Sequence, residues 1–326
     1  MTAESFTMRD GERTIRFGEG SAAEAPDLLR QAGFESYTLL TTERAAGSAP
    51  VADGAAQVVE VPPGLVDEIS ASLLPETGEG PLVALGGGRV IDTTKAIASL
   101  TGAPVAAIPT TLSGAELTPF HRTPAGVEGA RMVRPSLVVA DPLLMTSQPG
   151  PELAASAMNA LAHGMEALYT PLANPLAELA ALRGAALIAS DDLALGALLC
   201  GWASATTGFA VHHATCQLLV RTVGSPHAQT NAVMLPHFAG MMAARAPGVM
   251  GQFARALGDP KGDPDAAAGR AAKLSARSGH TRLATLGVED EHLPRVAAAV
   301  RQHPALHNTP DPPDEQELLD LLRAAL

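Results

Sequence analysis

The sequence contains very little cysteine: Cys200 and Cys216 are the only two among its 326 residues. Two cysteines cannot form the disulfide framework of a small secreted domain, and they suit a reducing compartment, so we expect a cytoplasmic protein. No apolar run approaches the roughly 20 residues needed to cross a bilayer, so no membrane helix is predicted. The first eleven residues are polar and carry both charge signs, which does not suit a signal peptide.

Positive charge is also scarce. Lys and Arg number 22 against 34 Asp and Glu, which gives a formal net charge of -12. Nucleic-acid binding needs a clustered excess of Lys and Arg, so no nucleic-acid partner is expected. Aromatic residues make up only 3% of the chain, but hydrophobic residues together reach 46%, which is typical of a well-buried globular protein. The length is sufficient for two domains.

The first half of the chain alternates short β-type runs with helical stretches. The runs predict strands at residues 14–17, 37–41, 57–61, 81–85, 105–108 and 137–140, with the first at a sheet edge. Helices are predicted at residues 22–32, 66–74 and 91–100. Strands that alternate with helices indicate a largely parallel sheet covered on both faces. Residues 1–148 are therefore predicted to form an α/β, Rossmann-like domain.

The second half is rich in Ala and Leu at helical spacing. Helices are predicted at residues 151–169, 176–188 and 192–219, and over most of the chain after residue 230. Residues 147–151 form a short Pro/Gly connection between the two halves. Residues 149–326 are therefore predicted to form an all-α domain.

A glycine loop is the strongest local motif. A predicted strand leads directly into Gly86, Gly87 and Gly88, and a helix follows. Glycines at such a junction let the backbone approach a phosphate, and the helix N-terminus offers free N–H groups. The next predicted strand ends in a segment with hydroxyl side chains, namely Thr110, Thr111 and Ser113. Both loops should meet at the carboxyl edge of the sheet, which is where nucleotides bind. The pattern is not the G-x-G-x-x-G fingerprint.

Histidines are concentrated in the helical half. Asn159 and His163 are four residues apart and so share one helix face, and His213 and His227 follow, fourteen residues apart. Such a group could bind a divalent metal through imidazole nitrogens, or its members could be buried, hydrogen-bonded core residues. Spacing alone leaves both interpretations open.

Together these motifs resemble the iron-containing alcohol dehydrogenases, and within that superfamily the maleylacetate reductases. The resemblance rests on Gly86-Gly-Gly-x-x-x-Asp92-x-x-Lys95, on Pro109-Thr-Thr-x-Ser-Gly-x-Glu116-x-Thr118, and on the Asn159-Ala-Leu-Ala-His163 and His212-His213-x-x-Cys216 blocks. It implies the dehydroquinate synthase-like fold of that superfamily and a homodimer. It also implies an NAD or NADP site made by the three glycines, Asp92, Thr110, Thr111, Ser113 and Thr118.

Four departures from the family pattern stand out. Arg89 replaces the usual Ser after the glycines, and it either pairs with a cofactor phosphate or obstructs it. Thr42 lies where an Asp commonly reads the adenosine ribose, which would relax a preference for NADH over NADPH. Asn159 replaces the Asp that joins His163, His213 and His227 as a metal ligand in the family, so a metal-poor or metal-free site is expected.

The fourth departure is Gln217, which stands where the family usually has a His that faces the nicotinamide; a Gln cannot supply a proton. His121 could supply it instead, and Arg122 could hold a substrate carboxylate.

Two functions follow from these features. The first is NAD(P)H-dependent reduction of a ketone or 2-enoate that bears a carboxylate, by hydride transfer in the interdomain cleft. His163, His213 and His227 would stabilise the developing oxyanion, with His121 or water as proton donor and Gln217 beside the nicotinamide. The alternative is a non-redox lyase, isomerase or cyclase on a dehydrogenase fold, because Arg89 and Gln217 both alter parts that redox turnover uses. In either case the partner is a small-molecule substrate.

Overall fold

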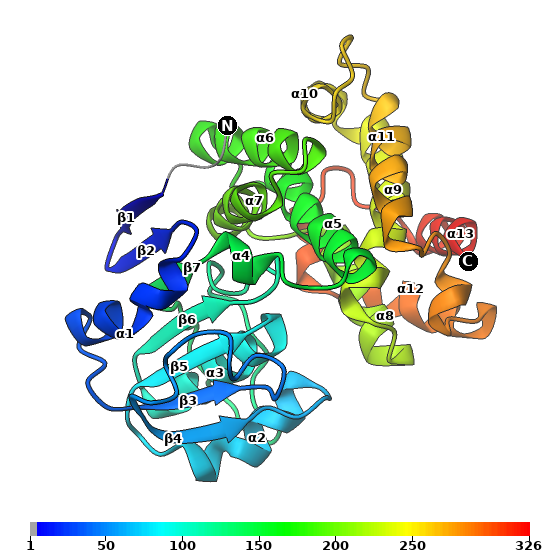
Figure 1. Ribbon diagram of the computed structural model, residues 1–326. Coiled ribbons are helices and arrows are strands. Elements are labelled where there is room, and N and C mark those ends of the chain that lie inside the picture. The colour runs from blue at the N-terminus through cyan, green and yellow to red at the C-terminus, as the bar shows by residue number, and fades with distance from the viewer. Residues whose placement is uncertain (1–4) are drawn as a thin grey trace. The chain divides into compact units, whose positions relative to one another are not determined.

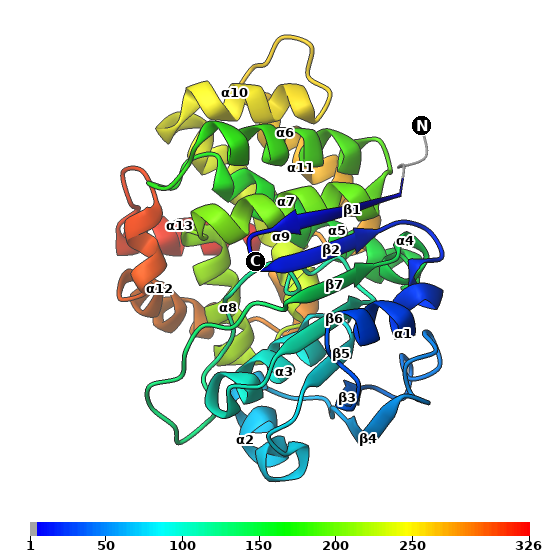
Figure 2. The same cartoon turned by 90° about the vertical axis from the view of Figure 1, so that its left-hand side faces the viewer.

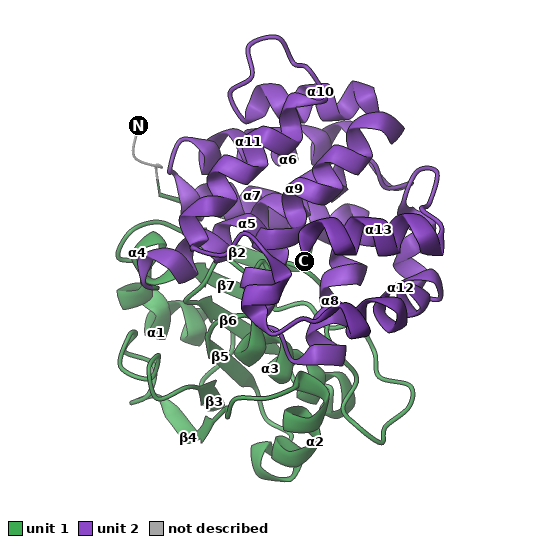
Figure 3. Ribbon diagram, turned by 90° about the vertical axis from the view of Figure 1, so that its right-hand side faces the viewer, with its two compact units in different colours: residues 1–148 green, residues 149–326 purple. Residues whose placement is uncertain are grey.

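The computed structural model describes residues 5–326, which divide after Gln148 into two units (Figure 3). Unit 1 is built on a seven-stranded sheet with the order β1-β2-β7-β6-β5-β3-β4 (Figure 2). All strand pairs are parallel except β1 with β2. The strands are β1 (Phe6–Asp10), β2 (Arg13–Phe17), β3 (Tyr37–Thr41), β4 (Ala55–Glu60), β5 (Leu82–Gly86), β6 (Val105–Pro109) and β7 (Leu137–Ala140).

Helices cover both faces of this sheet (Figure 1). The helices of unit 1 are α1 (Ser21–Gln31), α2 (Val66–Thr77), α3 (Gly88–Thr101) and α4 (Pro142–Met145). Alternate residues of one strand point to opposite faces. Leu82 and Ala84 of β5 accordingly pack with α2 and α3, whereas Val83 and Leu85 pack with α1. The fully buried strands explain the short apolar runs of the sequence.

Unit 2 is helical. It contains α5 (Gly150–Ala167), α6 (Pro175–Ala189), α7 (Leu193–Thr207), α8 (Val211–Val223), α9 (His227–Arg245), α10 (Pro247–Ala256), α11 (Ala266–Ser275), α12 (Leu293–Arg301) and α13 (Glu315–Ala325). Short 3-10 turns occur at Ala276–Ser278, Leu283–Leu286, Asp290–His292 and Pro304–Asn308. The predicted fold class, an α/β domain with a mainly parallel sheet followed by an all-α domain, is confirmed.

Two sequence-based expectations were wrong in detail. The run at residues 14–17 is not an edge strand, because β1 pairs with it and forms the edge itself. The single helix expected at residues 192–219 is two helices, α7 and α8, bent by 99° at a break around Gly208. Gly208 has φ +77°, a backbone conformation that an α-helix cannot continue through. The residues on both sides of Gly208 are mostly apolar and helix-forming, so the sequence pattern does not reveal the break.

Between residues 5 and 326, no single helix is both long and apolar enough to cross a membrane, although the bent α7–α8 pair would pass on length and composition taken together.

Glycine allows α6 and α7 to approach each other closely. A Cβ added at Gly184 would lie 2.6 Å from the Cys200 sulfur and 2.7 Å from the Gly196 carbonyl oxygen. These distances are shorter than van der Waals contact, and one of the atoms belongs to backbone. The two helices can therefore pack at this separation only if residue 184 has no side chain.

We predict that Gly184→Ala lowers the free energy of unfolding by about 1–3 kcal/mol, because overpacking outweighs the gain in helix propensity. Gly269 is the matched control, since it lies inside α11 with no atom within 4 Å of an added Cβ. Gly269→Ala should instead stabilise the protein by about 0.5–1 kcal/mol. Urea unfolding of both variants measures the difference, and equal effects would contradict the packing argument.

Candidate functional site

In unit 1 the glycine loop is pressed against the neighbouring loop. A Cβ added at Gly87 would lie 2.7 Å from Thr111 Cγ2, and one at Gly88 would lie 3.0 Å from Ser113 Cβ. None of the three glycines has a positive φ, so close approach, and not backbone conformation, explains them. The contact brings Thr111 and Ser113 to the N-terminal end of α3.

Two hydroxyls of this second loop are unused by the protein. Thr110 Oγ1 and Thr111 Oγ1 are buried and have no hydrogen-bond partner among residues 5–326. Buried polar atoms normally have partners, so these two are suited to a polar ligand. Together with the free N–H groups at the start of α3 they fit the phosphate and ribose of a dinucleotide.

Arg89 is exposed on the first turn of α3. An exposed guanidinium at this position is accessible to an anion that binds at the N-terminus of α3.

Lys95 anchors the loop that follows β6. It is fully buried, and its Nζ donates hydrogen bonds to the carbonyl oxygens of Ala115, Thr118 and Phe120, at 2.8, 3.1 and 2.6 Å. Its charge is balanced by Asp92, 2.8 Å away. Asp92, predicted to bind the cofactor, thus has a partner inside the protein, and Thr118 is held in place through its carbonyl group.

Glu116 lies between the anchored residues Ala115 and Thr118 and is a further functional candidate. The sequence motif contains it, but the sequence alone gives it no role. Glu116 is 1% exposed, and its Oε2 has no hydrogen-bond partner in the described chain. Burial raises the pKa of this carboxyl to about 7, partly offset by a hydrogen bond to the backbone and by attraction to Lys95. Nothing local in the sequence reveals this burial.

His121, predicted as a proton donor, is engaged within its own loop. Its Nδ1 lies 2.9 Å from the Arg122 carbonyl oxygen and its Nε2 lies 3.1 Å from the Arg131 carbonyl oxygen. Both partners are carbonyl oxygens, so a neutral ring donates to one of them, and either bond ties His121 to its own loop over residues 121–131. This arrangement favours a structural role for His121.

In unit 2 the structure brings His163 of α5 and His213 of α8 together. Their rings stack with centroids 4.1 Å apart and planes 18° apart. His163 Nδ1 is 3.2 Å from Ser204 Oγ, and His213 Nδ1 is 2.6 Å from Glu166 Oε2. His213 Nε2 is buried with no hydrogen-bond partner in the part of the chain that the structure describes. It is the atom of this group best placed to receive a ligand.

Burial also sets the charge of this group. It lowers the pKa of His213 to about 3, with a further contribution from repulsion by His227. It raises the pKa of the Glu166 carboxyl. Both shifts oppose a charged imidazole beside a charged carboxylate, so His213 is neutral at neutral pH.

The other predicted residues of unit 2 lie around this pair. Asn159 is buried on α5, one turn before His163, and Gln217 is half-buried on α8, one turn after His213. His227 is different: it is exposed at the first position of α9, where Asn231 Nδ2 lies 3.3 Å from its Nε2.

These residues do not fit a shared divalent metal ion. A metal–imidazole bond lies in the ring plane at about 2.0–2.1 Å, and two nearly parallel stacked rings cannot both meet that condition for one ion. Within residues 5–326, the group whose ligand atoms lie within 4.8 Å of one another is Glu166, His212 and His213, not the predicted trio of histidines. The oxygens of Glu166 are occupied by His213 and by backbone N–H groups.

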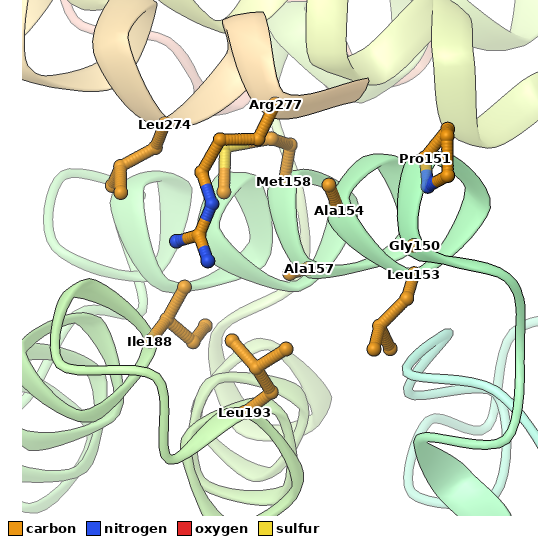
Figure 4. Close-up of a pocket in the computed structure, with 10 residues that line it drawn as sticks. All are labelled: Gly150, Pro151, Leu153, Ala154, Ala157, Met158, Ile188, Leu193, Leu274 and Arg277. Atoms are coloured by element: carbon orange, nitrogen blue, oxygen red, sulfur yellow. The ribbon is translucent and has the colours of Figure 1, made fainter. Parts of the chain in front are cut away.

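A separate cavity of about 380 Å³ lies within unit 2, beside the first half of α5 (Figure 4). Its walls are mostly apolar, and the one charged lining side chain, Arg277, is 2.7 Å from Asp191 Oδ1. None of the predicted site residues lines it.

Almost the whole chain matches models of one protein family. Residues 12–142 match the family model for iron-containing alcohol dehydrogenase, and residues 153–326 match the C-terminal model of the same family. A maleylacetate reductase from Sphingobium indicum is 32% identical over 96% of this chain and 95% of its own. Maleylacetate reductase 1 from Rhodococcus opacus is 34% identical over 84% and 79%. The crystal structure of maleylacetate reductase from Rhizobium sp. strain MTP-10005 superposes with a TM-score of 0.83 at 28% identity, covering 99% of this chain and 98% of that one.

The buried carboxyl of Glu116 predicts a pH dependence of stability. Its pKa is about 7 in the folded protein against an ordinary value of 4.5, so the folded state binds the proton more tightly. The stabilisation is complete below about pH 4.5 and is lost as the pH rises through 7, by up to ~3 kcal/mol. Urea unfolding should show the free energy of unfolding of wild type falling between pH 5 and 8 relative to Glu116→Gln. Equal pH slopes for the two proteins would contradict this account.

Proposed function

The chain belongs to the iron-containing alcohol dehydrogenase family and is an oxidoreductase, and from this premise we propose that it is an NAD(P)H-dependent reductase of a carboxylate-bearing ketone or 2-enoate. The substrate class follows the names of its maleylacetate reductase relatives. The observation that carries the proposal is the buried, unpartnered Nε2 of His213, on a ring whose other nitrogen is held by Glu166.

Unit 1 would hold the cofactor. Gly86, Gly87 and Gly88 with the start of α3 would receive the pyrophosphate, and the residues that would contact ribose and nicotinamide are Thr110, Thr111, Ser113 and Thr118. A bound reduced nicotinamide supplies a hydride. The exposed Arg89 is free to reach a phosphate, which is why we favour pairing over obstruction. Lys95 keeps the threonine loop in place.

Unit 2 would act on the substrate oxygen. During carbonyl reduction this oxygen gains negative charge, and a hydrogen-bond donor fixed in a buried site stabilises that charge strongly. His213 is such a group when its Nε2 carries the proton and its Nδ1 accepts a hydrogen bond from a protonated Glu166 carboxyl, a form that the raised pKa of this buried group favours. The stacked ring of His163 keeps the His213 ring from tilting. Water or His163 would then give the alkoxide oxygen the proton that completes the reduction. No metal is invoked, since the donor atoms do not converge on one ion.

We also propose that the protein works as a homodimer, as the family resemblance implies. Light scattering of the purified protein tests this assembly directly.

The cofactor part of the proposal predicts that Gly87→Ala weakens NADH or NADPH binding at least about tenfold, because the new Cβ displaces Thr111 from the loop. A titration followed by nicotinamide fluorescence measures this affinity. Gly248→Ala is a matched control, because an added Cβ there meets no atom within 4 Å. Failure of the folded wild type to bind either nucleotide would refute the cofactor assignment.

The substrate part predicts that wild type oxidises NADH or NADPH when maleylacetate or another carboxylate-bearing ketone or enoate is added, as read at 340 nm. His213→Ala should lower kcat by about 100-fold or more while nucleotide affinity is unchanged. His237→Ala, a half-buried histidine on α9 outside the stacked pair, is the control and should keep its kcat. Full activity of His213→Ala would remove the proposed site.

A further inference from the structure

Glu166 connects the stacked histidines to the start of α8. It lies on α5, one turn after His163, and is fully buried. Its Oε1 accepts hydrogen bonds from the backbone N–H groups of His212 and His213, at 2.8 and 3.3 Å. Its Oε2 is 2.6 Å from His213 Nδ1. One carboxyl group therefore caps a helix N-terminus and also holds the side chain of a residue in that helix's first turn.

Three aromatic side chains surround the ring of His213. His163 stacks on its face, the edge of His212 lies at a centroid distance of 5.0 Å, and Phe209 lies at 5.9 Å. The aromatic neighbours limit tilting, but they do not distinguish Nδ1 from the carbon that would replace it after a half-turn of the ring. Among the contacts of residues 5–326, only the one with Glu166 makes that distinction, because a C–H group cannot replace the nitrogen in it.

We propose that Glu166 is a positioning residue for the reduction: by holding Nδ1 of His213 it fixes which ring nitrogen faces the substrate oxygen. This inference rests on the proposed function, in which Nε2 of His213 acts on that oxygen. An outer hydrogen bond that orients a functional imidazole has a large effect elsewhere in proteins, typically 10–100-fold in activity or affinity.

The geometry also predicts which substitution preserves the role. In Glu166→Gln the amide oxygen can still accept from the two backbone N–H groups, and the amide NH₂ can donate to Nδ1. Nδ1 is then the acceptor, and a neutral His213 carries its proton on Nε2. In Glu166→Ala both contacts are lost, and the ring is free to turn over.

Thr309 provides a matched control for the capping contribution. Its Oγ1 accepts a 3.1 Å hydrogen bond from the N–H of Val211, the first residue of the same helix, and it does not contact His213 in the bonds described. Thr309→Val therefore weakens the same helix N-terminus without releasing the imidazole. Comparison of the two variants separates loss of a helix cap from loss of orientation.

The experiment measures kcat, KM for nucleotide and melting temperature for Glu166→Ala, Glu166→Gln and Thr309→Val. We expect kcat to fall about 100-fold in Glu166→Ala with nucleotide KM within about twofold, because the cofactor contacts lie in unit 1. Glu166→Gln should recover kcat to within about tenfold of wild type. Thr309→Val should lose melting temperature but retain kcat. Retained kcat in Glu166→Ala, an equal loss in Thr309→Val, or no recovery in Glu166→Gln would each overturn the proposal.

A second readout needs no substrate. Imidazole ¹⁵N NMR of the full-length protein, with His213 assigned through His213→Ala, reports which ring nitrogen carries hydrogen. We expect one tautomer in wild type and in Thr309→Val, and a mixture in Glu166→Ala. If wild type reduces no substrate but this pattern holds, the proposed function is wrong while the positioning contact stands. A single unchanged tautomer in Glu166→Ala would refute the positioning role itself.

Discussion

The carboxyl group of Glu166 joins α5 to α8, and most of what is distinctive in unit 2 depends on that contact. The chain breaks at Gly208, and the new helix must then satisfy its first N–H groups inside the protein. Glu166 and Thr309 accept three of these hydrogen bonds. A helix begun in this way places His213 in its first turn, against His163. Without a buried acceptor from α5, a helix start at this depth would leave unsatisfied donors, which is costly.

In unit 1 a buried cation, Lys95, holds a loop in place. Lys95 reaches from α3 to three carbonyl groups of the loop after β6, so the loop that carries Ser113 and Thr118 is fixed to the helix whose N-terminus we propose as the phosphate site. The charge is tolerable because Asp92 is paired with it and Glu116 lies nearby. Each unit thus uses one buried ionisable side chain to hold a loop or helix start, and leaves nearby polar atoms, Thr110 Oγ1 and His213 Nε2, available to a ligand.

Many of the strands and helices, and the glycine loop, could be predicted from the sequence, because each depends on residues that are neighbours in the chain. Strand β3 and the start of α2 were placed correctly from apolar runs, and the glycine loop from three consecutive residues. The break at Gly208 was missed, since the flanking residues are uniformly helix-forming and the capping acceptors lie over 40 residues away in sequence. For the same reason the contacts of Glu166 and Lys95 could not be assigned from the sequence. Sequence spacing grouped His227 with His163 and His213, yet it is exposed while they are buried, because spacing carries no information on depth.

The most direct test is a crystal structure of the protein with NAD⁺ and a hydroxy-acid product analogue. The account predicts that an oxygen of the analogue lies within about 2.6–3.2 Å of His213 Nε2, while Nδ1 remains on Glu166. A ligand oxygen held elsewhere, with Nε2 bound to another protein group or to a metal ion, would contradict it.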